Sequence, residues 1–239
     1  MRRAVLAVAL LLAVPISQAE EAIHVAYSER PPYMITQPDG TPGGLTGAPT
    51  TAAFKSAGIP VQWHKVPTNR QLMMIKDHSS LSCAIGWFNT PERQQYGKFT
   101  KPIYRDRTWV VLTNASFAAR NIGSLDELSR QHDARVLIKD NYSYGELDTF
   151  MQHWQPVTGI STASTLKMVR SVSKGLVDLM FVSEEEGKYI IENHAGENAP
   201  NLRLLQFKDM PRGMERYIMC GKNVPDEVIA RLNKAITFK

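Results

Sequence analysis

The pattern of hydrophobic and polar positions changes repeatedly along the chain between a two-residue period and a helical period. Apolar runs typical of strands occupy residues 23–28, 61–66, 81–88, 108–113, 135–138, 179–182, 202–207 and 216–221. Amphipathic patterns typical of helices occupy residues 47–57, 69–78, 124–131, 145–153, 164–174, 184–193 and 226–236. Strands that alternate with helices in this way predict an α/β architecture with largely parallel sheets. Ligands of such sheets bind beyond the carboxyl ends of the strands, which here are residues 28–33, 86–90, 139–143 and 183–185.

The first 19 residues have the pattern of a secretory signal. Two arginines are followed by an apolar run at residues 4–14, and Ser17 and Ala19 have the small size and spacing of a signal-peptidase site. The apolar run is shorter than the ~20 residues that span a membrane, with an N-terminal membrane anchor as the alternative. No later stretch is long and apolar enough to span a bilayer. We therefore expect cleavage after Ala19 and a soluble periplasmic protein without membrane insertion.

Composition limits the protein to an ordinary globular class. The 220 residues after Ala19 are enough for one large domain or for two lobes of about 100 residues each. Hydrophobic residues make up 43% of the chain and charged residues 21%. Loss of Arg2 and Arg3 lowers the formal net charge from +5 to +3. Because no basic stripe is present, we do not expect nucleic acid as a partner.

The chain has two cysteines, Cys83 and Cys220, and each lies in an apolar run typical of a strand. Buried unpaired cysteines behave as small hydrophobic residues, and this is the state we expect. A disulfide between them is the alternative, since the periplasm permits one. No histidine stands at a metal-ligand spacing from either cysteine, so we expect no metal site and no cofactor.

Residues 84–93, Ala-Ile-Gly-Trp-Phe-Asn-Thr-Pro-Glu-Arg, carry the pattern most informative about chemistry. A strand runs into Gly86, and Thr90 followed by proline is typical of a capped helix N-terminus. Arg93 lies one turn further, where a cation opposes the helix dipole unless an anion is held there too. Its planar guanidinium matches the two oxygens of a carboxylate. The local pattern leaves two interpretations of Arg93, an anion-binding residue or a surface arginine paired with Glu92 or another acid.

The block Gly-x-x-x-Thr-Pro-Glu-Arg, followed by Phe-Thr-x-Pro-x-Tyr at 99–104, resembles the signature of family 3 periplasmic solute-binding proteins. These are the amino-acid receptors of bacterial ABC importers. Weaker similarities lie in Ser-Glu-Arg-Pro-Pro-Tyr at 28–33, Gly-Leu-Val-Asp at 175–178 and Pro-Asp-Glu at 225–227.

The resemblance implies a type II periplasmic binding protein: two lobes joined by two crossover strands at a hinge, with the ligand between them. Lobe 1 would comprise residues 20–108 and 213–239, and lobe 2 residues 109–212, with crossovers near 105–109 and 210–216.

The resemblance also implies a ligand-binding role for particular side chains. Arg93 would grip the ligand carboxylate with help from Thr90, while Tyr33 and Trp87 would sandwich its apolar part. Ser143, expected beside a helix N-terminus of lobe 2, would offer a hydroxyl and an N–H to the same carboxylate. Core packing of the two aromatic residues and simple helix capping by the serine are the alternatives.

One departure from the family pattern concerns the ligand's amino group. Amino-acid binders of this family place an aspartate that holds the ligand ammonium where this chain has Ser183, so Ser183 is expected among the ligand-binding residues. Glu184 or Glu185 would substitute for it, or would simply be solvated acids at a helix start. Asp178, at the preceding turn, is expected to be structural.

These patterns together predict a monomeric, non-enzymatic binding protein that closes around a small carboxylate, foremost an amino acid, for an ABC importer. Two alternatives stay open. One is a dehydratase-like enzyme on the same fold that acts on cyclic carboxylates through Glu184 or Glu185. The other is a receptor that reports its ligand to a membrane sensor kinase. A serine hydrolase is not expected, because the segment around Ser143 lacks the leading glycine of a nucleophile elbow.

Overall fold

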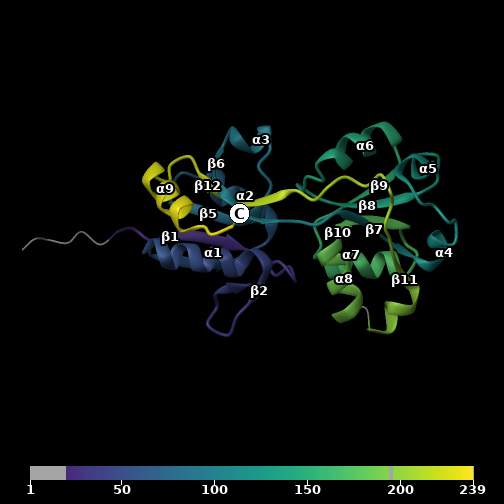
Figure 1. Cartoon of the computed structure of the whole chain (residues 1–239), viewed down its shortest axis with the longest axis horizontal. Helices are drawn as coiled ribbons and strands as arrows, with labels where there is room; N and C mark the ends of the chain where they lie inside the picture. Colours follow the sequence, from purple (N-terminus) through teal and green to yellow (C-terminus); the bar gives the residue numbers. More distant parts are fainter. Residues whose placement is uncertain (1–19, 194–195, 239) are drawn as a thin grey trace, which may run out of the picture.

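A computed structural model describes residues 20–193 and 196–238 of the chain. The predicted signal sequence and its cleavage point lie outside the described residues. Figure 1 shows two bodies side by side along the long axis, with two chain segments passing between them. These segments are residues 106–108 and 206–214, which separate the strands of one sheet from the strands of the other. The expected two-lobed architecture is thus present.

Lobe 1 is built on a five-stranded sheet with the order β4-β1-β5-β12-β6. Its strands are β1 (Ile23–Tyr27), β4 (Val61–Lys65), β5 (Ser82–Trp87), β6 (Gly97–Arg105) and β12 (Glu215–Gly221). Its helices are α1 (Gly44–Ala57), α2 (Thr68–Lys76), α3 (Pro91–Gln94) and α9 (Asp226–Ala235). A small hairpin of β2 (Ile35–Thr36) and β3 (Pro42–Gly43) precedes α1. Alternate strand residues face opposite ways, so Val25 packs with Phe54 of α1 while Ala26 packs with Ile75 of α2.

Lobe 2 is built on a second five-stranded sheet with the order β11-β7-β10-β8-β9. Its strands are β7 (Trp109–Asn114), β8 (Arg135–Lys139), β9 (Val157–Ser161), β10 (Leu179–Ser183) and β11 (Leu202–Leu205). Its helices are α4 (Ala115–Ala118), α5 (Leu125–Ser129), α6 (Glu146–Trp154), α7 (Thr165–Ser173), α8 (Glu184–Asn193) and the 3₁₀ turn η1 (Gly196–Asn201). Phe181 faces Leu147 of α6, and its neighbour Met180 faces Met168 of α7. Each lobe therefore has a hydrophobic core of its own.

The expectation of largely parallel sheets was wrong. In lobe 1 the returning strand β12 is antiparallel to both β5 and β6, and in lobe 2 strand β7 is antiparallel to both β10 and β11. The parallel pairs are β1 with β4 and β5, and β8 with β9 and β10. Both sheets are mixed because the crossovers bring β7 and β12 into them in the opposite direction.

The expectation of two unpaired cysteines was also wrong. Cys83 on β5 and Cys220 on β12 stand directly opposite each other in the antiparallel ladder and form a disulfide. Both residues are fully buried. The residues of the pair are 137 positions apart, so their adjacency depends on strand order and register.

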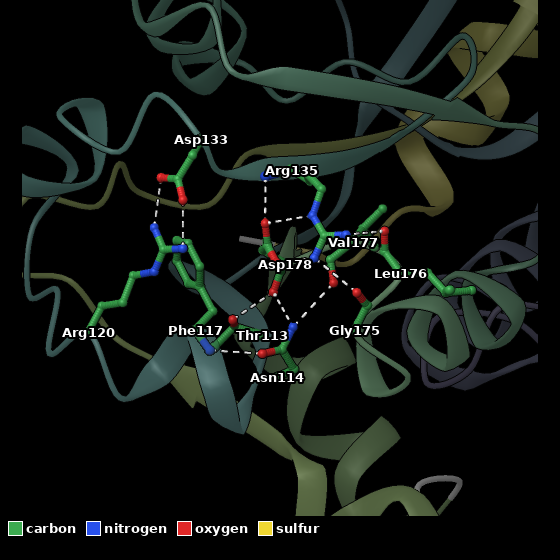
Figure 2. Close-up of polar contacts among 10 residues, drawn as sticks. All are labelled: Thr113, Asn114, Phe117, Arg120, Asp133, Arg135, Gly175, Leu176, Val177 and Asp178. Atoms are coloured by element: carbon green, nitrogen blue, oxygen red, sulfur yellow. Dashed lines mark hydrogen bonds and ion pairs between the residues drawn. The ribbon is translucent and has the colours of Figure 1, made fainter.

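Asp178 is a structural residue, as expected (Figure 2). Its carboxylate accepts hydrogen bonds from the backbone N–H of Arg135 at 2.8 Å and from the guanidinium of the same residue at 3.1 and 2.6 Å. Its carbonyl accepts from the hydroxyl of Thr113 at 2.7 Å. These contacts join the turn before β10 to the start of β8 and the end of β7, at the end of lobe 2 that lies away from lobe 1.

Across residues 20–193 and 196–238, no helix combines the length and the apolar character needed to cross a membrane. In the same part of the chain, no group of three or more His, Cys, Asp or Glu side chains is placed to hold a metal ion.

Candidate binding site between the lobes

Side chains from both lobes line a small cavity that is partly open to solvent. We call it the inner cavity. Lobe 1 contributes the carboxyl end of β5, the loop after β1, α2 and the start of β12, and lobe 2 contributes the loop after β8. The lining residues are Ser28, Arg30, Met34, Thr68, Gln71, Ile85, Gly86, Trp87, Phe88, Arg93, Tyr142, Ser143 and Arg216. A second cavity, the outer cavity, adjoins it and shares Arg93, Tyr142 and Ser143.

Arg93 projects into this gap and is only 6% exposed. Its guanidinium donates to the carbonyl of Phe88 at 3.1 Å and, across the gap, to the carbonyl of Asn141 at 3.1 Å. The same group lies 4.7 Å from the centre of the Trp87 ring. Within the described chain it forms no ion pair, which excludes a surface arginine paired with Glu92. Burial lowers the pKa of Arg93, and the nearby Tyr96 and Glu92 offset this effect only in part.

Local sequence chemistry places Arg93 at this point. Thr90 is the N-cap of α3, and its hydroxyl accepts from the backbone N–H of Arg93 at 3.3 Å. Gly86 has a φ of 76°, a left-handed conformation that turns the chain out of β5 at little cost for glycine. The indole N–H of Trp87 donates to the side-chain oxygen of Gln71 at 3.1 Å, which fixes the ring beneath the guanidinium.

Arg216, on β12, is a second arginine of the inner cavity and is not among the predicted site residues. It forms a bidentate pair with Asp106, with both N–O distances 2.6 Å, and donates to the carbonyl of Gly86 at 3.1 Å. Its guanidinium lies 4.0 Å from the ring centre of Tyr33 and 4.6 Å from that of Phe88. Burial lowers the pKa of Arg216, but the charge and hydrogen bonds of Asp106, together with Tyr33, outweigh burial and raise the pKa.

Arg30, from the loop after β1, is the third arginine and crosses to lobe 2. It binds Glu186 of α8 through two hydrogen bonds of 2.8 and 2.7 Å. Glu186 is 1% exposed. Burial would raise the pKa of this carboxyl, yet Arg30 lowers it below the ordinary value. Tyr142 packs its ring 4.8 Å from the Arg30 guanidinium and closes the inner cavity from the side of lobe 2.

The predicted sandwich of Tyr33 and Trp87 differs from the observed arrangement. Tyr33 is fully buried, and Arg216 covers its ring, so the aromatic side chains that line the inner cavity are Trp87, Phe88 and Tyr142. The hydroxyl of Tyr33 instead donates to the hydroxyl of Ser183 at 2.5 Å, which joins the lobes.

Ser143 lies at the cavity, whereas Ser183 and Glu184 do not line the inner or outer cavity. The Ser143 hydroxyl donates to the carboxylate of Asp148 at 3.0 Å and accepts from the backbone N–H of Gly145 at 3.2 Å. Ser183 accepts from the backbone N–H of Glu186 at 3.2 Å and caps α8. Glu184 pairs with Lys188 on the same helix.

The residues that sequence reasoning missed are Arg30, Gln71, Arg216, Asp106 and Glu186. A usable signal existed for two of them. Arg30 lies in the segment that follows the predicted strand 23–28. Ligands of α/β sheets bind at such carboxyl ends, so an arginine there is a candidate site residue. Glu186 follows the two acids that were considered, and the helical period turns it inward. The pairing of Arg216 with Asp106 had no local signal.

A two-lobed α/β molecule with an arginine-lined gap between mixed five-stranded sheets is a type II periplasmic binding protein. The chain matches the family of bacterial extracellular solute-binding proteins, family 3, over residues 23–237, and it belongs to that family.

Solved structures of similar fold include an ancestral arginine-binding protein bound to arginine, 14% identical, with a TM-score of 0.69 and 90% of each chain covered. The arginine-, lysine-, histidine-binding protein ArtJ of Geobacillus stearothermophilus is 16% identical, with a TM-score of 0.70 and 91% of this chain and 88% of ArtJ covered. An amino acid ABC transporter substrate-binding protein of Streptococcus pneumoniae bound to L-arginine is 17% identical, with a TM-score of 0.69 and coverage of 90% and 86%. No curated protein matches the chain.

Proposed function

We propose that this protein captures a small carboxylate-bearing molecule between its lobes in the periplasm and presents it to an ABC importer. The observation that carries the proposal is the buried guanidinium of Arg93, which faces an interlobe cavity without a carboxylate partner. A carboxylate there would replace water lost on burial and form charge-assisted hydrogen bonds. The part of the inner cavity lined by Trp87 and Phe88 would hold the apolar part of the ligand.

Closure follows from the position of the site between two separately folded lobes. Arg93 and Trp87 belong to lobe 1, and Tyr142 and Ser143 belong to lobe 2, so a ligand that contacts all four favours the closed arrangement over the open one. Exclusion of water strengthens the pair between guanidinium and carboxylate. The hinge in this proposal is formed by 106–108 and 206–214, which fits lobe boundaries after residues 108 and 212.

Binding is favoured over dehydratase chemistry by the positions of the acids. Glu184 pairs with Lys188, and Glu185 accepts from Tyr104 at 2.7 Å and from the N–H of Arg107 at 2.8 Å. Neither glutamate lines the inner or outer cavity. A dehydratase needs a general acid within hydrogen-bond reach of the ligand that Arg93 holds, and neither glutamate has that position.

The test is a thermal-shift screen against amino acids and other small carboxylates, because a ligand that binds only the folded form raises the melting temperature. Amino acids come first in the screen, since the structural neighbours are described with arginine and glutamine bound. The variant Arg93→Ala should lose the response, whereas Arg170→Ala, an exposed arginine of α7, should keep it. Equal responses of the R93A protein and the wild type would refute the proposal.

A further inference from the structure

The charged groups around the inner cavity do not cancel. Three arginines line it, and two of them bind both oxygens of a carboxylate. Arg30 is paired in this way with Glu186, and Arg216 with Asp106. Arg93 has no such partner in the described chain. Lys139, which lines a neighbouring cavity, lies over the ring of Tyr142 and forms no ion pair with a described residue. The cavity therefore carries an excess of positive charge.

No Asp or Glu side chain is among the described residues that line the inner cavity. The oxygen Oε2 of Glu185 is buried without a hydrogen-bond partner, but Glu185 lines neither the inner nor the outer cavity. Both carboxylate oxygens of Glu186 accept from Arg30, and both of Asp106 accept from Arg216. Asp148, in the outer cavity, accepts through its oxygen Oδ2 from the hydroxyl of Ser143 at 3.0 Å and from the N–H of Tyr144 at 2.9 Å. It lies beyond the serine and not in the inner cavity.

The neutral polar side chains of the wall are those of Ser28, Thr68, Gln71, Tyr142 and Ser143, and none of them supplies a negative charge. The side-chain oxygen of Gln71 accepts from the indole of Trp87. The Ser143 hydroxyl accepts from the N–H of Gly145. The remaining wall is apolar and aromatic, formed by Met34, Ile85, Trp87 and Phe88.

Resting on the proposed function, we infer that the inner cavity takes a small organic carboxylate that lacks an amino group. A ligand carboxylate has Arg93 as its partner, and an apolar body has the aromatic wall. An ammonium in the same space would meet Arg30 and Arg216 and would find no carboxylate in the wall, so its charge would be buried without an opposite charge. The cavity thus selects the deaminated acid over the α-amino acid of the same shape.

Matched ligand pairs test this selection. Each pair consists of an α-amino acid and the acid without its amino group: alanine and propionate, aspartate and succinate, glutamate and glutarate, phenylalanine and 3-phenylpropionate. Affinities are measured by titration calorimetry on protein unfolded, dialysed and refolded to remove co-purified ligand. For the pair that binds best, we expect the deaminated acid to bind about tenfold or more tightly than the amino acid, since the unpaired buried cation opposes binding.

Two controls complete the design. The amide 3-phenylpropionamide, which lacks the carboxylate, should not bind. The variant Arg93→Ala, which lacks the guanidinium, should not bind the deaminated acid. An amino acid that binds as tightly as its deaminated partner, or more tightly, overturns the inference and leaves the proposed capture of carboxylates standing. If no member of any pair binds, the proposed function fails and the inference fails with it.

Discussion

Replacement of Glu186 by glutamine should loosen the contact between the lobes without unfolding either of them. The side chain of Glu186 is 1% exposed and that of its partner Arg30 is 13% exposed, so the pair is shielded from water in the closed arrangement. Removal of one partner from a buried ion pair costs about 3–5 kcal/mol, mostly because the other charge is left unpaired. Glutamine retains one acceptor oxygen, so the lower part of this range applies.

Because the two lobes can separate at the hinge, loss of the pair should change the free energy of lobe closure more than the free energy of unfolding. Arg30 belongs to lobe 1 and Glu186 to lobe 2, and each lobe has its own core. Separation of the lobes returns the Arg30 charge to water, so the penalty is relieved by opening and not by unfolding. A loss of about 3 kcal/mol would shift the closing equilibrium by roughly a hundredfold. Ligand affinity should fall by a similar factor, because ligand must then select a rarer state.

Small-angle X-ray scattering and urea unfolding separate the two outcomes. We expect E186Q to have a larger radius of gyration than the wild type and an unfolding free energy lowered by less than about 1 kcal/mol. Glu192→Gln, at an exposed position of the same helix, should change neither quantity. An unchanged radius of gyration, together with an unfolding free energy lowered by the full 3 kcal/mol, would show that the pair acts as part of a single core and would refute the reasoning.

The remaining predictions concern stability. Cys83→Ala with Cys220→Ala should lower the unfolding free energy by about 2–5 kcal/mol, because the disulfide closes a long loop, and reduction of the wild type should reproduce the loss in urea. Asp178→Ala should cost about 1–2 kcal/mol and leave ligand affinity unchanged, whereas Asp133→Ala, whose pair with Arg120 is exposed, should cost less than about 1 kcal/mol (Figure 2). Because the pKa of Glu186 is lowered in the folded protein, its contribution is complete above the ordinary carboxyl pKa and is lost as the pH falls below about 4.5. Because the pair holds the lobes together, the radius of gyration of the wild type should rise as the pH falls through this range, whereas that of E186Q should change less; parallel curves would contradict this.

Local signals predicted the parts of the fold that depend on neighbours in sequence. Thr90 caps α3, and Ser124 caps α5 with a hydrogen bond from Glu127 at 3.1 Å, as their residue types indicate. The strands β6 and β9 were not predicted. Both lie at the edge of a sheet, and one side of each faces solvent, so their residues lack a continuous apolar run.

The candidate site was predictable in the same partial way. Arg93 could be found because its cap, helix start and strand are contiguous in the chain. The partners of the other two arginines could not, since Arg30 and Glu186 are 156 positions apart and Arg216 and Asp106 are 110 apart. Which arginine is left for a ligand depends on these long-range pairs, and composition and spacing do not contain that information.

The disulfide has a consequence for how lobe 2 is attached. Strand β5 lies before the chain leaves for lobe 2, and β12 begins after its return, so Cys83 and Cys220 fasten the outgoing part of the chain to the incoming part. The whole of lobe 2 is a covalently closed insertion mounted on lobe 1. If lobe 2 unfolded alone, its two ends would stay close together on a folded lobe 1, and it would refold from these fixed ends.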